Sequence, residues 1–340
     1  MVMRAFVLER YGGPDATGLR EVPRPRPGPR ELLVRVHAAG LNPVDYKIRG
    51  GKLKVIYRYP LPVTMGNELA GTVEALGEGA TRFAEGDRVF ARVEKERLGA
   101  FAEYACVGED LAARMPASLD FEAAAGVPLA GLTALQCLRD ELQVTKGQRI
   151  FISGGAGGVG TFALQLAKWL GAEVTTTASA RGEALVRRLG ADRVVDYTKS
   201  RFEDELRDYD GALDLVGGNS LARTFAIVKR GAMVVSIAGM PEPETARKDL
   251  GGSARLAALF WLASLGTRIQ ARKHGVRYRY LFMHPSSAEL EELARLVDDG
   301  KLEVVVDRVF PFEEIGEAMA HLEQGHAKGK VVVSMANVVA

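Results

Sequence analysis

The spacing of apolar residues divides the chain into two regions. In residues 1–125, short runs rich in Val, Leu and aromatic residues are interrupted by Gly and Pro every few positions, as in residues 31–38 and 69–76. This spacing is typical of strands joined by turns. We therefore predict a mostly antiparallel β domain over residues 1–125.

A different pattern begins near Gly126. Strand-like apolar runs alternate with amphipathic segments of helix length, first residues 148–153, then 157–170, then 173–177. Such alternation indicates βαβ units and a parallel sheet. The predicted fold class is therefore α/β, with a Rossmann-type doubly wound parallel sheet beside the antiparallel domain.

The clearest motif is the glycine turn at residues 154–160, which follows the strand-like run 148–153 and opens a helical pattern. Three of its glycines match G-x-G-x-x-G: the first allows a tight turn, the second lets the backbone approach a diphosphate, and the third lets helix pack on strand. The helix N-terminus would favour the negative charge. The predicted cofactor-binding residues here are Gly155, Ala156, Gly157, Gly158, Val159 and Gly160.

The residues that follow the next strand distinguish NADPH from NADH. An NAD enzyme usually places Asp or Glu about 20 residues after the glycines, but here the run 173–177 leads into Ser179 and Arg181 without an acid. A hydroxyl and a guanidinium suit a 2′-phosphate, which a carboxylate would repel. Ser179 could instead cap a helix, with Arg181 as a solvated surface residue. NADP(H) is the predicted cofactor.

Composition narrows the functional classes. The 340 residues, 47% hydrophobic and 26% charged, indicate a globular protein with two domains. A net charge of +2 gives no basic field of the kind that nucleic acid requires. The cysteines, Cys106 and Cys137, are too few for a disulfide framework or a four-thiolate metal site. Together with the absence of a signal-peptide pattern before the strand expected at residues 2–8, this predicts a cytoplasmic protein.

Several further segments resemble the medium-chain dehydrogenase/reductase superfamily. They are residues 40–49, 86–90, 127–134, 189–192 and 196–197, besides the glycine turn. Within the superfamily the chain is most similar to the zinc-free quinone oxidoreductase branch, which includes zeta-crystallin-like proteins and plant enone or alkenal reductases. The resemblance covers nearly the whole chain. It implies a GroES-like catalytic domain at residues 1–125, completed by residues 286–340, with the NADP(H)-binding Rossmann domain at residues 126–285 inserted between them.

The chain departs from its zinc-dependent relatives at the metal ligands. Those proteins carry Cys where Asn42 stands and Gly-His-Glu where Gly66, Asn67 and Glu68 stand, and they have a four-Cys lobe that residues 92–99 lack. The five histidines show no zinc-ligand spacing. We therefore expect no metal site. Without a Lewis acid, alcohol dehydrogenation is disfavoured, whereas a conjugated carbonyl needs only a hydrogen-bond donor for its developing charge.

The resemblance places residues 42–47 beside the nicotinamide and supplies the catalytic candidates. Asn42 can donate a hydrogen bond to the substrate or to the nicotinamide ribose, and Lys47 can supply positive charge or anchor the cofactor. Tyr46 could donate a proton or simply pack. Asp45, next to a turn, is expected to hydrogen-bond nearby backbone.

The resemblance also implies cofactor contacts outside the glycine turn. Thr133 lies in a segment that reaches the cofactor in the family, Tyr197 follows the third strand, Ile237 and Gly239 end a later strand, and Lys330 matches a basic position near the cofactor. Alternatives stay open for three of them. Thr133 could bond its own backbone, Tyr197 could cover the core edge, and Lys330 could lie on the surface.

The segment 241–283 resembles the family least. It holds the apolar run 256–265, followed by a basic patch of Arg268, Arg272, Lys273, Arg277 and Arg279. The run is about half of the roughly 20 residues that a membrane span requires, so no stable membrane insertion is expected. We predict core packing or a pocket lid, with a membrane-surface helix as the lesser alternative.

Residues 276–283 are rich in Tyr, Val and Phe, and in relatives the equivalent edge strand pairs with its twin across a dimer. A homodimer is therefore predicted. The leading function is NADPH-dependent reduction of a small quinone or enone by hydride transfer. Two alternatives stay open: an alcohol or acyl-thioester reductase on the same fold, and a non-catalytic NADPH-binding protein of the crystallin type.

Overall fold

The computed structural model describes residues 1–335, so the last five residues of the expected segment 286–340 lie outside the described part. The chain divides into two compact units: residues 1–132 together with the segment from residue 285 onward, and residues 133–284. The expected boundary between residues 125 and 126 is displaced. Residues 126–132 belong to the first unit because Gly126 lies against Lys330, and Gly131 against Leu293, both in the C-terminal segment.

Within residues 1–335, the first unit contains two β-sheets. A seven-stranded sheet has the order β15-β16-β3-β5-β6-β8, with β7 paired to β3, and a three-stranded sheet has the order β2-β1-β4. All strand pairs are antiparallel except β15 with β16. The strands are β1 Val2–Leu8, β2 Thr17–Pro23, β3 Glu31–Leu41, β4 Val63–Thr64, β5 Glu68–Leu76, β6 Arg88–Arg92, β7 Tyr104–Gly108, β8 Ala112–Arg114, β15 Val306–Pro311 and β16 Lys330–Ser334. The prediction of a mostly antiparallel domain is confirmed.

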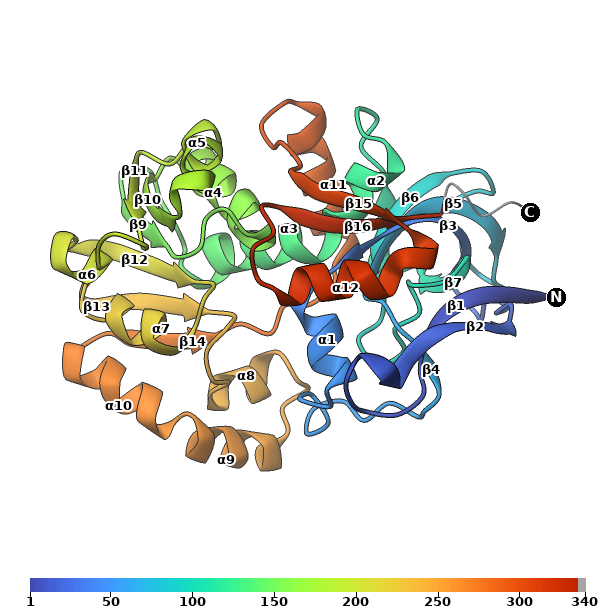
Figure 1. Cartoon of the computed structure of the whole chain (residues 1–340), viewed down its shortest axis with the longest axis horizontal. Helices are drawn as coiled ribbons and strands as arrows, with labels where there is room; N and C mark the ends of the chain where they lie inside the picture. The colour runs from blue at the N-terminus through green and yellow to red at the C-terminus, as the bar shows by residue number, and fades with distance from the viewer. Residues whose placement is uncertain (336–340) are drawn as a thin grey trace. The chain divides into compact units, whose positions relative to one another are not determined.

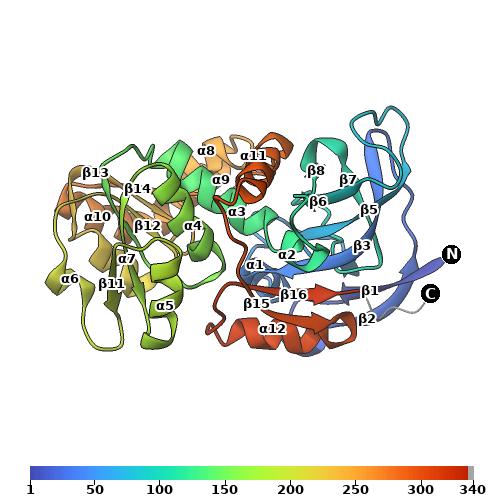
Figure 2. The same cartoon turned by 90° about the horizontal axis from the view of Figure 1, so that it is seen from above.

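Helices pack on the seven-stranded sheet of the first unit, on central strands as well as at its edges. α12 lies beside β15 and β16 in both views (Figures 1 and 2). The helices are α1 Pro43–Arg49, α2 Phe121–Ala125, α3 Pro128–Leu135, α11 Ser287–Asp298 and α12 Ile315–Glu323. α3 continues past the boundary into the second unit. Residues 38–41 of β3 and 330–333 of β16 are buried on both faces, so the two sequence segments of the first unit share one core.

The second unit is a six-stranded sheet in which every pair is parallel, in the order β11-β10-β9-β12-β13-β14. Its strands are β9 Arg149–Ile152, β10 Glu173–Ala178, β11 Arg193–Asp196, β12 Tyr209–Asp214, β13 Val228–Ser236 and β14 Arg277–Tyr280. The strand order reverses direction on either side of β9. In parallel sheets ligands bind at such a reversal, outside the carboxyl ends of the strands.

The helices of the second unit follow the predicted alternation. They are α4 Gly158–Trp169, α5 Ala180–Arg188, α6 Phe202–Glu205, α7 Gly218–Thr224, α8 Pro243–Lys248, α9 Ala254–Ala263 and α10 Leu265–His274. α4 packs on β9 and β10 through Phe162, Ala163 and Leu166, all buried at helical spacing, which stabilises its amphipathic face. It ends before Gly171, whose φ of +86° is the left-handed conformation that favours glycine after a helix.

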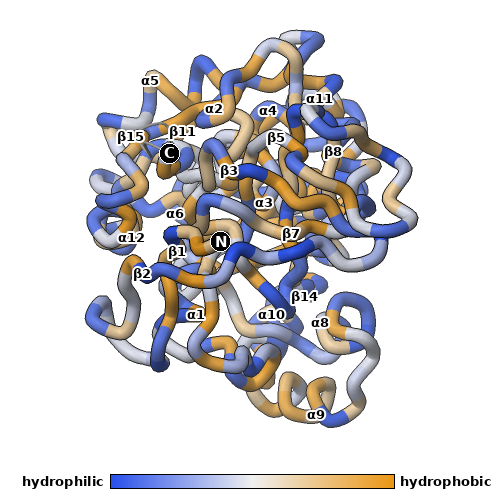
Figure 3. Tube along the Cα trace, turned by 90° about the vertical axis from the view of Figure 1, so that its right-hand side faces the viewer, coloured by the Kyte–Doolittle hydropathy of each residue, from blue (hydrophilic) through white to orange (hydrophobic). Residues whose placement is uncertain are grey.

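The apolar run 256–265 was predicted to pack in the core or to form a pocket lid, and the structure does not place it in the core. Within α9 only Ala257 and Phe260 are buried, whereas Leu259, Trp261 and Leu262 are exposed. The reason is that α9 packs mainly on the short helix α8, which covers only one side of it. Figure 3 shows α9 as a hydrophobic segment over most of its length. Among the described residues no helix combines the length and the apolar character that crossing a membrane requires.

Candidate functional site

The glycine turn between β9 and α4 is fixed by contacts with β10. Gly155 donates its amide to Thr177 O at 3.2 Å, and Gly154 donates to Thr177 Oγ1 at 2.9 Å. A Cβ on Gly155 would lie 2.3 Å from Thr176 Oγ1, and one on Gly160 would lie 2.4 Å from Gly154 O. The fold itself therefore requires glycine at positions 155 and 160, because neighbouring strand and turn atoms leave no room.

Gly157 differs from these two glycines. It is the N-cap of α4 with φ −78° and ψ 172°, a backbone conformation that any residue can adopt. A Cβ there would be 3.5 Å from its nearest neighbour, Gly154 O, which is an ordinary contact. The described structure thus gives no internal reason for glycine at position 157. A ligand that approaches the helix N-terminus closely would give one.

The first turn of α5 lies against the glycine turn. Gly182 packs on Ala156, since a Cβ on Gly182 would be 3.1 Å from Ala156 Cβ. Ser179 is the N-cap of α5, but its side chain makes no capping hydrogen bond, so the capping alternative is not observed. Arg181 is exposed in the same turn. The structure therefore brings these two residues to the same edge of the sheet as the glycines.

A buried polar network links the carboxyl ends of β9, β12 and β13. Asp214, fully buried, accepts hydrogen bonds from Ser153 Oγ at 3.1 Å and from Ser236 Oγ at 2.7 Å. It also accepts the amide of Gly217, at 3.0 Å from Oδ2. Burial raises the pKa of Asp214, and these hydrogen bonds act in the opposite direction. The network fixes the loops that leave the strands at the edge where the glycine turn lies.

This network positions two predicted contacts, Ile237 and Gly239, and its own residues were not predicted from the sequence. Ser236 Oγ accepts the amide of Gly239 at 2.8 Å, which holds the segment after β13, including the half-buried Ile237. Ser153, Asp214 and Ser236 each stand at or directly after the end of a strand. That shared position was the available signal, because strand ends of a parallel sheet meet at one edge. Tyr197, just after β11, is 59% exposed and therefore does not cover the core edge.

In the first unit, Asn42 belongs to a buried cluster with Glu68 and Lys330. Asn42 Nδ2 donates to Glu68 Oε1 at 2.6 Å, and Lys330 Nζ donates to Asn42 Oδ1 and, at 2.8 Å, to Glu68 Oε1. Glu68 Oε2 accepts the Leu129 amide at 2.6 Å. Only this orientation of the Asn42 amide pairs each donor with an acceptor. The cluster therefore fixes Asn42 and leaves its second N–H outside these contacts.

The structure corrects two expectations for Lys330. The residue is 2% exposed, so the surface alternative is wrong. Its ammonium group donates to three acceptors of its own unit, Leu41 O at 3.1 Å, Asn42 Oδ1 and Glu68 Oε1. An ammonium group has three N–H donors, so none is left for a cofactor contact in this arrangement. Lys330 instead donates a hydrogen bond to the side-chain oxygen of Asn42 and so orients that amide.

Asp45, Asn67 and Arg92 extend the cluster. Asp45 Oδ2 accepts a hydrogen bond from the backbone N–H of Asn42 at 2.7 Å, as expected for a residue next to a turn. Asp45 Oδ1 accepts a hydrogen bond from Asn67 Nδ2. Burial raises the pKa of Asp45 to about 6, and the hydrogen bonds from Asn67 and Asn42 oppose that shift. Burial also lowers the pKa of Arg92, which donates to Asn67 O at 3.2 Å.

The other catalytic candidates lie on α1 in less buried positions. Tyr46 and Lys47 are half-buried. Burial raises the pKa of the Tyr46 hydroxyl and lowers the pKa of the Lys47 ammonium group, with Glu323 and Lys52 respectively adding to the shift. Thr133, on α3, is buried. It is the first residue of the second unit.

The donor set around Asn42 does not fit zinc. Zinc in proteins takes Cys thiolate, His nitrogen and carboxylate ligands. Here the side-chain amide of Asn42 and the ammonium group of Lys330 contact Glu68, and the side-chain amide of Asn67 contacts Asp45. Within residues 1–335 no three His, Cys, Asp or Glu side chains come together in a way that could hold a metal ion.

Two family models match the chain: an alcohol dehydrogenase GroES-like domain at residues 28–117 and a zinc-binding dehydrogenase at residues 189–333. The mitochondrial NAD(P)H oxidoreductase RTN4IP1 of Danio rerio is 35% identical, over 98% of this chain and 92% of that protein. The chain belongs to the medium-chain dehydrogenase/reductase superfamily. The resemblance stated from the sequence is thereby confirmed.

Other members of this superfamily are similar over nearly the whole chain. The chloroplastic NADPH-dependent alkenal/one oxidoreductase of Arabidopsis thaliana is 35% identical, over 97% of this chain and 79% of that protein. The solved quinone oxidoreductase of Coxiella burnetii is 31% identical with a TM-score of 0.85, covering 98% of this chain and 100% of that one. The α/β fold with a GroES-like domain and a Rossmann-like parallel sheet is therefore confirmed.

Proposed function

We propose that this protein uses NADPH to reduce quinones or α,β-unsaturated carbonyl compounds by direct hydride transfer, without zinc. The observation that carries the proposal is Gly157. The fold tolerates a larger residue at this helix N-terminus, so the glycine is explained by a diphosphate that approaches the backbone closely. The names of the relatives, an NADPH-dependent alkenal/one oxidoreductase and a quinone oxidoreductase, support this chemistry.

NADPH, when bound, would supply a hydride, and the residues of the second unit would hold it. The amides at the start of α4 would bind the diphosphate. Ser179, with its hydroxyl outside any cap, and the exposed Arg181 would bind the 2′-phosphate. Further contacts are proposed for Tyr197, Ile237, Gly239 and Thr133.

On the substrate side we propose Asn42, Tyr46 and Lys47 of the first unit. The second N–H of Asn42 would donate to the substrate oxygen as it becomes negative. Glu68 and Lys330 hold that amide in one orientation, so little reorganisation would accompany the reaction. Burial lowers the pKa of Lys47, which eases transfer of a proton from its ammonium group, while Tyr46 would be an alternative donor.

Zinc independence is proposed from the chemistry of the donors. A metal ion at Asn42 would have to share Glu68 with an ammonium group whose nitrogen is 2.8 Å from the same carboxylate oxygen. A zinc ion about 2 Å from that oxygen would lie within a few ångströms of the ammonium group, and like charges that close repel strongly in a buried site. Polarisation of the substrate would therefore come from hydrogen bonding.

The experiment is NADPH oxidation by the purified, metal-analysed protein. Benzoquinone and but-3-en-2-one are the expected acceptors, and butan-2-one, which lacks the conjugated double bond, is the matched control. We expect turnover with either conjugated acceptor and not with butan-2-one, at sub-stoichiometric zinc. Tight NADPH binding without any turnover would instead indicate a binding protein, and turnover that tracks zinc content would indicate an alcohol dehydrogenase-type enzyme.

We also propose a homodimer through β14. Among the described strands β14 pairs only with β13 and ends the sheet, so its other edge has backbone groups without a strand partner. The strand Arg277–Tyr280 is shorter than the expected run 276–283. Light scattering should give twice the chain mass, and replacing Tyr278 by Pro, which removes an edge donor, should shift the protein towards the monomer.

A further inference from the structure

An exposed apolar stripe runs along α9 and α10. Leu262 is 64% exposed, and Leu265 and Ile269, at 37% and 42%, follow it at helical spacing. Leu259 and Trp261 widen the stripe on α9, at 44% and 49%. Scattered exposed apolar residues are ordinary, but a contiguous patch of large ones marks an interaction surface. We call these five residues the α9–α10 face.

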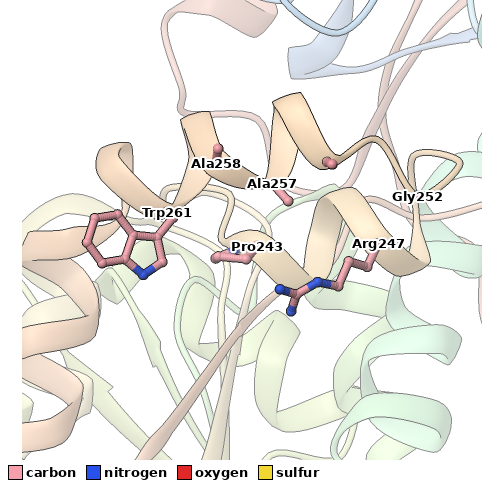
Figure 4. Close-up of a pocket in the computed structure, with 7 residues that line it drawn as sticks. Pro243, Arg247, Gly252, Ala257, Ala258 and Trp261 are labelled. Atoms are coloured by element: carbon pink, nitrogen blue, oxygen red, sulfur yellow. The ribbon is translucent and has the colours of Figure 1, made fainter.

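The α9–α10 face lies beside a hollow between α8 and α9. α8 and α9 line an open hollow of about 370 Å³, with Pro243, Arg247, Ala257 and Trp261 among its lining residues. Figure 4 shows Trp261 at one end of this hollow and Arg247 at the other, with Ala257 facing Pro243. Ala257 on the buried side of α9 lines the hollow, and Trp261 borders it while remaining 49% exposed. Leu259 and Leu262 of the face are not among the lining residues and are exposed.

The segment of the chain that carries the face has charges of one sign. Between Asp249 and Glu289 the chain has no acidic residue but six basic ones, namely Arg255, Arg268, Arg272, Lys273, Arg277 and Arg279. Arg279 is buried and neutralised by Asp249, Glu242 and Glu141. The other five are exposed or half-buried. The helices α9 and α10 that carry the apolar stripe therefore have charged side chains of positive sign only.

Arg268 couples the charge to the aromatic ring. Its guanidinium donates to Trp261 O at 2.7 Å and to Ser264 Oγ at 3.1 Å, and its Cζ lies 5.3 Å from the centre of the Trp261 ring. A cation held beside an indole is suited to a membrane interface, where Trp and basic side chains concentrate at the level of the lipid headgroups.

We propose that α9 and α10 dock on the surface of an anionic lipid bilayer. The apolar stripe would enter the boundary between headgroups and acyl chains, and the basic residues would contact lipid phosphates. A second copy of this chain is a poorer occupant, because two faces of the same positive sign would repel each other. The proposal concerns peripheral binding and does not depend on the proposed reaction.

Tryptophan fluorescence tests the proposal directly. The chain has two tryptophans, Trp169 on α4 and Trp261 on the face. Trp169→Phe leaves Trp261 as the single reporter. With vesicles of phosphatidylcholine and phosphatidylglycerol we expect a blue shift of its emission and co-sedimentation of the protein, both reversed by high salt. Vesicles of phosphatidylcholine alone should give much weaker binding.

Two variants in that background separate the contributions. Arg272→Glu with Lys273→Glu should lower vesicle partitioning at least 25-fold, since each basic residue contributes about fivefold at an anionic surface. Leu262→Glu should lower it about tenfold or more by removing apolar burial. Val309→Glu, which changes an exposed apolar residue of the first unit, is the matched control and should bind as the parent does.

Three results would overturn the proposal. The first is an unchanged Trp261 spectrum with anionic vesicles, and the second is equal binding to neutral and anionic vesicles. The third is a Leu262→Glu variant that dissociates a dimer in light scattering while vesicle binding is absent from the parent protein, which would assign the face to self-association. Circular dichroism and NADPH binding check that each variant is folded.

Discussion

The glycine turn of the second unit and the buried cluster of the first use their polar groups in opposite ways. At the turn, the fold requires glycine at positions 155 and 160 but not at position 157. The first backbone N–H groups of α4 have no acceptor within the helix and can therefore bind a ligand. In the cluster, the three N–H groups of the Lys330 ammonium donate hydrogen bonds to Leu41 O, Asn42 Oδ1 and Glu68 Oε1. We propose that the turn binds a ligand, whereas the cluster holds a single side-chain amide in place.

The largest effect should come from breaking the cluster. Lys330→Met leaves the Glu68 carboxylate buried without its cation, which should lower the free energy of unfolding by about 3–5 kcal/mol. Chemical denaturation measures this, and Glu68→Gln with Lys330→Met should recover part of the loss because no unpaired charge remains. If the single variant loses under ~1 kcal/mol, the pair is not the buried interaction described.

The pH dependence of the cluster gives a second, smaller effect. Because the folded pKa of Asp45 is raised to about 6, the folded state holds this proton more tightly than the unfolded state. Stability from this group is thus present below the unfolded pKa and is lost as the pH rises towards 6 and above, by roughly 3 kcal/mol at most. Other carboxylates titrate too, so the difference between wild type and Asp45→Asn is the quantity to measure.

Asp45→Asn should flatten that part of the pH profile. Denaturant titrations of both proteins at about pH 4 and about pH 7 should show the variant gaining relative stability at the higher pH. A constant difference across this range would show that the carboxyl titrates as an exposed one does.

Gly157→Ala sharpens the contrast at the turn. The fold accommodates the methyl group, so stability should change by less than about 0.5 kcal/mol. NADPH affinity should fall about 30-fold, roughly 2 kcal/mol, because the methyl group occupies the approach of the diphosphate. Calorimetry measures the affinity, with Gly316→Ala, at another open position, as control. Unchanged affinity would place the diphosphate elsewhere.

Arg181→Ala should have the smallest effect and a selective one. Loss of a charge-assisted hydrogen bond to the 2′-phosphate should weaken NADPH binding about tenfold and leave NADH binding unchanged. Arg187→Ala on the same helix, where Arg187 pairs with Glu183, is the control and should change neither. Equal weakening of both nucleotides would deny Arg181 a role in choosing between them.

The sequence was informative where the determinants are local. The strand, glycine turn and helix at residues 148–170 adjoin one another, so spacing alone predicted them. The pairs of Lys330 with Asn42 and Glu68 span 288 and 262 residues, and no local pattern marks a lysine at the start of a strand as buried. The prediction that α9 is buried was wrong, because an apolar run has the same sequence pattern whether or not another element covers it.

The transfer of label from deuterated NADPH tests the central claim most directly. NADPH carrying deuterium at C4 of the nicotinamide, on the face that is transferred, is incubated with but-3-en-2-one and chelator-treated protein. We expect deuterium on the β-carbon of the product and a rate unchanged by chelation. Product without label, or activity that disappears on chelation and returns with zinc, would contradict it.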